Sequence, residues 1–180
     1  MNGWASLGEG GRMRFQIRVN PETLHRSDQG PITCQVWIEV SGTSFPEESW
    51  SDFAVVILGW WIEGALRLVL EDSQSESFPF MDGAFSFELA RANGGQFRVR
   101  LGRRCVGPGV KGGKLRGVVE RITEESVQAG VVVSDDLVRE LLSSSNLLLR
   151  ECRQRGWGGA DIDVLAEAHR RLALAKREPE

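Results

Sequence analysis

Histidine is scarce in this sequence, and the motifs that would give it a catalytic role are missing. His25 lies in a polar stretch, and His169 stands beside Arg170 and Arg171 on a predicted helix. No Gly-x-Ser-x-Gly nucleophile elbow occurs, and neither histidine accompanies a Ser or Cys in a known nucleophile motif. We therefore expect surface histidines rather than a triad. An enzyme would need carboxylates that converge only in three dimensions.

Cysteine is rare as well, and its spacing excludes the usual structural uses. Cys34, Cys105 and Cys152 are an odd number with no close pair, which argues against a disulfide framework and a zinc site. Acidic pairs such as Asp135-Asp136 and Asp161-x-Asp163 lack the alternating ligands and glycine of a calcium loop, and helix starts favour them through the dipole. The sequence predicts neither a metal nor a cofactor.

Long apolar runs and a basic excess are also lacking. The longest apolar run covers 53–62, whereas a membrane helix needs about 20 residues. The N-terminus lacks the basic region followed by an apolar core that is typical of a signal peptide. We therefore expect a cytoplasmic protein with no membrane contact. The net charge of −3 disfavours a dedicated nucleic-acid binder. The glycines at 107 and 112 have P-loop spacing, but Gly113 stands where the lysine is required, so 107–114 is interpreted as a solvated linker.

Two stretches near the N-terminus alternate between apolar and polar residues, which is typical of half-buried strands. The first runs from Arg12 to Val19 and is expected to stop at Asn20-Pro21, with 20–31 as a polar connection. The second runs from Ile32 to Val40 and pairs most simply antiparallel with the first. The Gly-rich residues 1–11 are expected to be disordered.

A helix over about 52–71 is the interpretation of the apolar segment that follows. Ser51 or Asp52 is a suitable N-cap, and length favours a helix over a strand at Val55 to Leu58. Glu63 and Arg67 are four residues apart and mark its only solvated stripe. Adjacent helical residues point about 100° apart, so Trp60 and Trp61 are expected to meet different core layers. The alternative is that one of them is exposed at an interface.

The remaining elements are predicted from turn signals and from periodicity. Asp82-Gly83 and Asn93-Gly94-Gly95 mark hairpin turns, and the glycine-rich, basic stretch 102–117 is expected to be a flexible connection. Ser134-Asp135-Asp136 is expected to cap a helix, whose middle is weakened by the polar run 143–146. The elements expected after the central helix are strands at 75–81, 84–91 and 96–102, a further edge strand at 115–122, and helices at 135–155 and from Asp161.

Together these patterns predict an α+β fold. We expect a mostly antiparallel sheet of five or six strands, with one internal helix on it and a C-terminal helical pair covering that helix. Residues 12–122 would form the β-rich core and 123–176 the helical segment, within a single domain.

Basic and aromatic residues on the polar strand faces are the candidate binding site. If their strands are neighbours, they form a surface that we call the basic platform, which consists of Arg14, Arg18, Trp37, Arg98 and Arg100. Trp and Arg concentrate binding energy at protein interfaces, so a protein partner is expected. The alternative is a nucleic-acid or anion-binding module that adds Lys111 and Lys114 to the same arginines. A homodimer through the apolar helix is a further option.

Three short signatures resemble small bacterial α+β proteins grouped with the immunity proteins of polymorphic toxin systems. These are Trp50-x-Asp52-Phe53 leading to Leu58-Gly59-Trp60-Trp61, then Phe80-Met81-Asp82-Gly83-x-Phe85, and finally Cys152-x-x-x-Gly156-Trp157. The resemblance covers residues 12–172. It implies a cytosolic, non-enzymatic protein that neutralises its partner by surface complementarity, and it assigns no functional residue.

Overall fold

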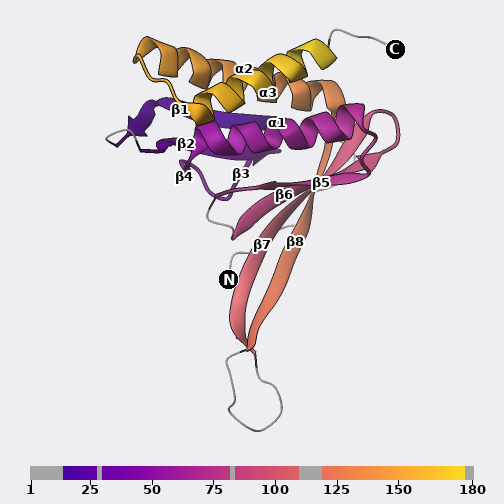
Figure 1. Cartoon of the computed structure of the whole chain (residues 1–180). Coiled ribbons are helices and arrows are strands. Elements are labelled where there is room, and N and C mark those ends of the chain that lie inside the picture. The colour runs from indigo at the N-terminus through magenta and orange to yellow at the C-terminus, as the bar shows by residue number, and fades with distance from the viewer. Residues whose placement is uncertain (1–13, 28–29, 82–83, 110–118, 177–180) are drawn as a thin grey trace.

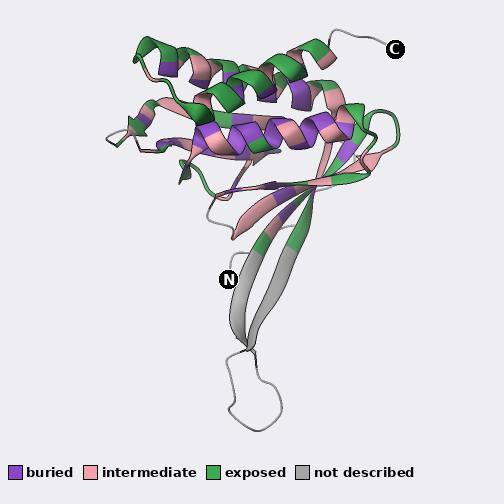
Figure 2. Cartoon of the chain, in the orientation of Figure 1, coloured by how far each residue is buried: buried purple, intermediate pink, exposed green. Residues whose placement is uncertain are grey.

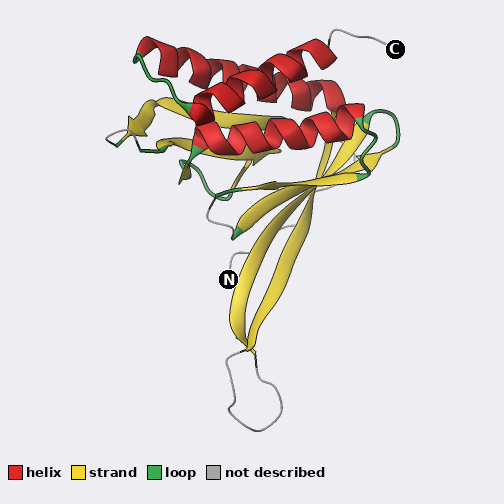
Figure 3. Ribbon diagram, viewed as in Figure 1, coloured by secondary structure: helices red, strands yellow, loops and turns green. Residues whose placement is uncertain are grey.

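The computed structural model describes residues 14–27, 30–81, 84–109 and 119–176, and it confirms the predicted α+β class. These residues form two antiparallel sheets of four strands and three helices (Figures 1 and 3). The strands were expected in one sheet of five or six. They divide into two sheets instead. The sequence did not reveal this division, because the alternation of side chains shows which face of a strand is buried but not which strands share a hydrogen-bond ladder.

The first sheet follows the predicted pairing of its two long strands. It contains β1 (Phe15–Arg26), β2 (Ile32–Val40), β3 (Thr43–Phe45) and β4 (Ser51–Asp52), with β2 paired to the other three. Alternate residues of β2 are buried, as predicted. The predicted stop at Asn20-Pro21 is wrong, since β1 continues to Arg26 through an irregularity between Asn20 and His25. Proline is tolerated there because β1 is an edge strand.

The free edge of β1 is covered by side chains of α2 (Ser134–Gln154). The backbone N–H of Ile17 donates to Glu140 Oε2 at 3.1 Å, and Ser144 Oγ donates to the Ile17 carbonyl at 3.4 Å. Further along, Arg155 donates to the carbonyls of Leu24 and Pro21. The helix therefore satisfies backbone groups that an open edge would offer to another strand.

The second sheet is the predicted meander, extended by a long final hairpin. Its strands are β5 (Ser75–Pro79), β6 (Phe85–Ala92), β7 (Gln96–Gly109) and β8 (Val119–Val133), in that spatial order. The interpretation of 102–117 as a flexible connection is wrong as far as Gly109, because β7 and β8 continue to pair up to Gly109 and Val119. Residues 110–118 and the Asp82-Gly83 turn lie outside the described residues. The pairing of β6 with β7 ends at Arg103, so the last part of the β7–β8 ribbon projects from the body as a two-stranded arm (Figure 1).

The central helix α1 (Ala54–Leu70) is buried on most of its circumference (Figure 2). It contacts β2, β5, α2 and α3 (Ala160–Ala175), so the predicted cover by the sheet and the terminal helices is confirmed. Trp61 is 0% exposed, and its ring lies 5.1 Å from the rings of both Phe80 and Phe87. Rings from β1 and β3 extend this aromatic cluster, which joins the two sheets to α1.

The C-terminal helices agree with the predicted ranges but not with the predicted caps. Val133 and Gly159 occupy the N-cap positions, and neither helix start has a side-chain cap hydrogen bond. Helix α2 continues through the serine run, where Ser144 and Ser145 are buried and donate to backbone carbonyls. Ile162 is half-buried, whereas the other predicted core residues of the two helices are buried. The buried residues are Leu137, Leu141, Leu148, Cys152, Leu165, Ala168 and Leu172.

Candidate protein-binding surface

The structure divides the predicted basic platform between the two sheets. Arg18 and Trp37 stand opposite each other on β1 and β2, and Arg14 is exposed just before β1. Arg98 and Arg100 are exposed on β7, in the other sheet. Arg18 is already engaged, since its Nε lies 2.9 Å from Glu39 Oε2. That these five residues bind a partner stays a prediction.

A second surface lies on the exposed side of α1, where the apolar character of the helix reaches the solvent. Phe53, Val56 and Trp60 follow one another at intervals of three and four residues, so they share one helix face. Trp60 is 43% exposed, whereas its neighbour Trp61 is fully buried. The expectation that both tryptophans meet core layers is therefore wrong for Trp60, and the alternative, in which one of them is exposed, agrees with the structure.

Helix α3 extends this apolar face. Val164 is 61% exposed, and its Cγ1 lies 4.0 Å from the position that a Cβ on Gly59 would occupy. Val164 therefore lies against α1 at Gly59, the residue before Trp60. We call the surface formed by Phe53, Val56, Trp60 and Val164 the α1–α3 band. Scattered exposed apolar residues are normal, but a run along two packed helices is a candidate docking surface.

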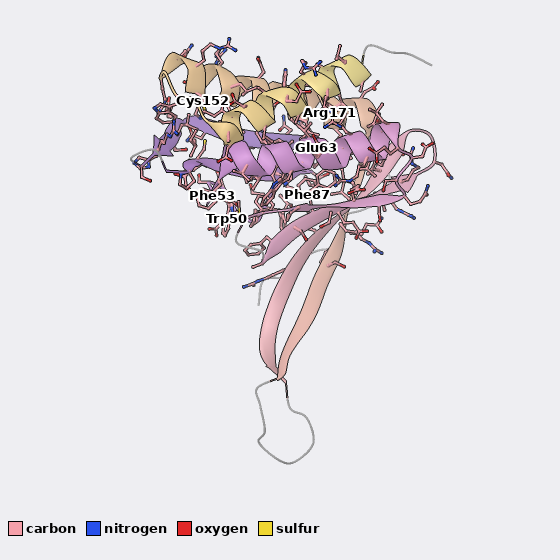
Figure 4. The ribbon with its side chains drawn as sticks, viewed as in Figure 1. Trp50, Phe53, Glu63, Phe87, Cys152 and Arg171 are labelled. Atoms are coloured by element: carbon pink, nitrogen blue, oxygen red, sulfur yellow. The ribbon has the colours of Figure 1, made fainter. Side chains whose placement is uncertain are left out.

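A pocket of about 320 Å³ adjoins the N-terminal end of the band. It is lined by Thr33, Trp50, Ser51, Asp52, Phe53 and Met81. Phe53 belongs to both the pocket and the band, so the two form one continuous surface, and Figure 4 shows Trp50 and Phe53 together at that end of α1. The Trp50 ring is held edge-on against Phe85 at 5.3 Å, which leaves it half-buried in the pocket wall.

The buried carboxylate of Asp52 organises the pocket. Its Oδ1 accepts a hydrogen bond from the backbone N–H of Phe53 at 2.7 Å. Its Oδ2 accepts one from the backbone N–H of Met81 at 2.9 Å and one from the indole N–H of Trp50 at 3.3 Å. Phe53 holds the N-cap position of α1 without a side-chain cap bond, so the predicted cap at Ser51 or Asp52 is wrong. Asp52 instead ties β4, the start of α1 and the segment before β6 into one preformed site.

Ion pairs fix the two helices beyond the apolar band. Arg171 Nη1 lies 2.5 Å from Glu63 Oε1 and so links α3 to α1, as Figure 4 shows. Arg67 bonds Glu76 of β5 at 2.8 Å, and this hydrogen bond lowers the pKa of the Glu76 carboxyl. The solvated stripe predicted from Glu63 and Arg67 is therefore real, and the band is its continuation toward the start of α1.

Sequence reasoning missed the α1–α3 band because almost every position of this helix is apolar. Periodicity needs contrast between faces, and residues 53–62 offer none. The available signal was the pair Glu63 and Arg67. Extending their face backwards by three or four residues at a time leads to Trp60 and then to Val56.

A serine–histidine contact between α2 and α3 was not expected from the sequence. Ser145 Oγ lies 2.8 Å from His169 Nδ1, but it also lies 2.6 Å from the Leu141 carbonyl. The hydroxyl has one proton, and donating it to the carbonyl leaves Oγ as acceptor for an Nδ1–H. The imidazole is then not placed to deprotonate this fully buried serine. The pair is a link between helices rather than an activated nucleophile.

The burial of His169 makes the stability of the fold depend on pH. Burial disfavours the imidazolium and lowers the pKa of His169 from its ordinary value of 6.5. The unfolded chain therefore takes up the proton first, so this contribution is complete above pH 6.5 and is lost as the pH falls toward the folded-state pKa.

We expect His169→Gln to lose less stability than the wild type between pH 7.5 and pH 5. Urea unfolding at both pH values measures this, with the exposed His25→Gln as control. Equal pH dependence in all three proteins would contradict the assignment.

The thiols and acids of the described residues offer no reactive or metal-binding cluster. Cys34 and Cys152 are buried free thiols, and burial raises the pKa of both. In residues 14–27, 30–81, 84–109 and 119–176, no three His, Cys, Asp or Glu residues gather so as to hold a metal ion. Over the same ranges, none of the helices combines the length and apolarity needed to cross a bilayer.

Comparison of the chain with protein-family models, with curated proteins and with solved structures finds no match. Its function therefore has to be inferred from its own geometry.

Proposed function

We propose that this chain is a non-catalytic protein-binding module whose partner docks on the α1–α3 band and the adjoining Trp50 pocket. The observation that carries the proposal is the exposure of Trp60 beside Phe53, Val56 and Val164, next to a preformed pocket. Exposed tryptophans that are surrounded by apolar residues supply much of the binding energy at protein interfaces. Rigid helices and a hydrogen-bonded pocket wall also reduce the entropy lost on binding.

Toxin neutralisation in the cytoplasm is the form of this function that the sequence resemblance favours. Blocking a partner by surface complementarity needs a rigid, exposed surface and no reacting groups. The band and pocket provide such a surface on α1 and α3, which pack against the rest of the core.

The alternative, a nucleic-acid module on the basic platform, receives less support from the geometry. Arg18 is paired with Glu39, and Arg100 stands opposite Glu88 on β6. A phosphate backbone would have to compete with these carboxylates. Arg98 remains as an exposed cation on the same strand, so the test below includes it.

The test is a pull-down from native cell lysate, with and without nuclease, in which a recovered protein is titrated against matched variants. We expect the protein to be retained after nuclease treatment, and Trp60→Ala to weaken its affinity at least about tenfold. Trp37→Ala is the matched control, because it removes a partly exposed tryptophan from the sheet face. Loss of binding in Trp37→Ala but not in Trp60→Ala would move the site to the platform. Loss on nuclease treatment and in Arg98→Ala would favour nucleic acid.

A further inference from the structure

The two segments that build the α1–α3 band and its pocket carry acidic side chains and no basic ones. Residues 40–62 and 156–168 contain no Lys, Arg or His, although the chain has 22 lysines and arginines. Glu47 and Glu48 are exposed in the loop before the pocket. Asp161 and Asp163 are exposed in the first turn of α3, beside Val164. Exposed carboxylates thus accompany the apolar surface in two places, the loop before the pocket and the start of α3.

These four carboxylates are not neutralised by the described part of the protein. We call Glu47, Glu48, Asp161 and Asp163 the rim acids. Glu63 and Glu167 are paired with Arg171 and Arg170, but the side chains of the rim acids have neither an ion pair nor a hydrogen bond with the described residues. Two arginines contact the segment before α3, and their partners there are neutral groups. Arg26 donates to the Gly158 carbonyl, while Arg155 bonds β1 carbonyls and lies over the Trp157 ring.

Folding alone does not explain all of these acids. Asp161 and Asp163 gain from the positive end of the α3 dipole, which accounts for them locally. Glu47 and Glu48 lie in a loop, where no helix dipole acts on them. An interface with a partner of opposite charge accounts for both pairs, because potentials across protein interfaces are arranged to be complementary.

We infer that the partner of this surface is a basic polypeptide segment, with an apolar anchor side chain flanked by lysine or arginine. The inference rests on the proposed function. The anchor lies against Trp60 or enters the Trp50 pocket, and the flanking cations face Glu47–Glu48 in the loop before the pocket and Asp161–Asp163 at the start of α3. A lysine or arginine over the exposed Trp60 ring adds a cation–π contact.

Charge also argues against the other occupants. A nucleic acid or an anionic lipid surface would place phosphates against the rim acids. A second copy would place rim acids opposite rim acids if the two bands paired, and like charges facing each other across an interface disfavour association.

The test is a selection of random 12-residue displayed peptides on the wild-type protein, with counter-selection on Trp60→Asp. We expect the surviving peptides to combine an aromatic residue or leucine with an excess of lysine and arginine. Survivors of neutral or acidic composition would overturn this inference and leave the proposed function standing. No Trp60-dependent enrichment would overturn both. A dimer in sedimentation analysis that Trp60→Asp dissolves would overturn the basic-partner assignment in favour of a second copy.

One selected basic peptide then tests where the charges act, by fluorescence anisotropy at 50 and 500 mM NaCl. The variant Glu48→Gln with Asp161→Asn should weaken binding about fivefold at low salt and little at high salt. The control, Glu22→Gln with Asp135→Asn, removes the same charge from exposed positions, one of which is again in the first turn of a helix. Equal losses in the two double variants would show that only net charge matters, which contradicts a rim-specific partner.

Discussion

Trp61→Ala should lower the free energy of unfolding by about 3–5 kcal/mol, the cost of truncating a large buried aromatic residue. Trp61 is fully buried, packs edge-on against Phe80 and Phe87 at 5.1 Å, and donates from Nε1 to the Pro79 carbonyl at 2.9 Å. Alanine would leave a cavity where α1 and the aromatic cluster meet, and it would remove the donor for that carbonyl. Urea unfolding followed by far-ultraviolet circular dichroism measures the change.

The adjacent Trp60→Ala is the matched control, with the same chemical change one position earlier. Because Trp60 projects into solvent, its loss should change the free energy of unfolding by no more than about 1 kcal/mol. The two variants should therefore separate stability from binding. The assignment of core and surface would be wrong if Trp60→Ala proved as destabilising as Trp61→Ala.

The difference between these neighbours shows where sequence reasoning works and where it stops. The 100° rotation between adjacent helical residues correctly predicted that the two rings point in different directions, but the expectation that both lie in the core was wrong for Trp60. Which ring is buried depends on Phe80 and Phe87, which pack on Trp61 and lie beyond the window of about 11–18 residues that periodicity examines. Val164 of α3 lies against α1 at Gly59, next to Trp60, and nothing in the local sequence indicates this contact.

The strands show the same division between local and non-local information. Alternation correctly located β2 and the meander, because a two-residue period is a local property of the chain. The passage of β1 through Pro21 was missed, because the carbonyls of Pro21 and Leu24 are satisfied by the distant Arg155. Glycine and proline in 107–109 indicated a linker, yet the backbone there pairs with β8.

The candidate site was harder to predict than the fold. Arginine and tryptophan on polar strand faces were visible to pattern reasoning, whereas the pocket draws on β2, β4, the start of α1 and Met81. Only the folded chain brings these together. The acidic rim could have been noticed earlier, since residues 40–62 contain no basic side chain, but its relation to residues 156–168 requires the packing of α3 on α1.

Asp52 is the residue at which fold and site depend on each other most directly. It is 7% exposed, and its two oxygens together accept three N–H groups from Trp50, Phe53 and Met81. The local pattern predicted a helix cap, but the remote Met81 N–H and the Trp50 indole take one oxygen, and Phe53 takes the other. A carboxylate suits this position because both of its oxygens are acceptors.

Asp52→Asn should lower the free energy of unfolding by about 2–4 kcal/mol, although the side chain keeps its shape. The new amide group supplies one acceptor oxygen and one NH₂, so at least one of the N–H donors would face another donor. Unfolding in urea measures the loss, and the NMR shifts of the Phe53 and Met81 amide protons report which bonds are broken. The exposed neighbour Ser51→Ala is the control, expected within about 0.5 kcal/mol of the wild type.

If Asp52→Asn unfolds at the wild-type urea concentration with both amide shifts unchanged, the carboxylate does not organise the pocket. If it is destabilised and also loses the partner that Trp60→Ala loses, the same three hydrogen bonds both stabilise the fold and shape the pocket for binding.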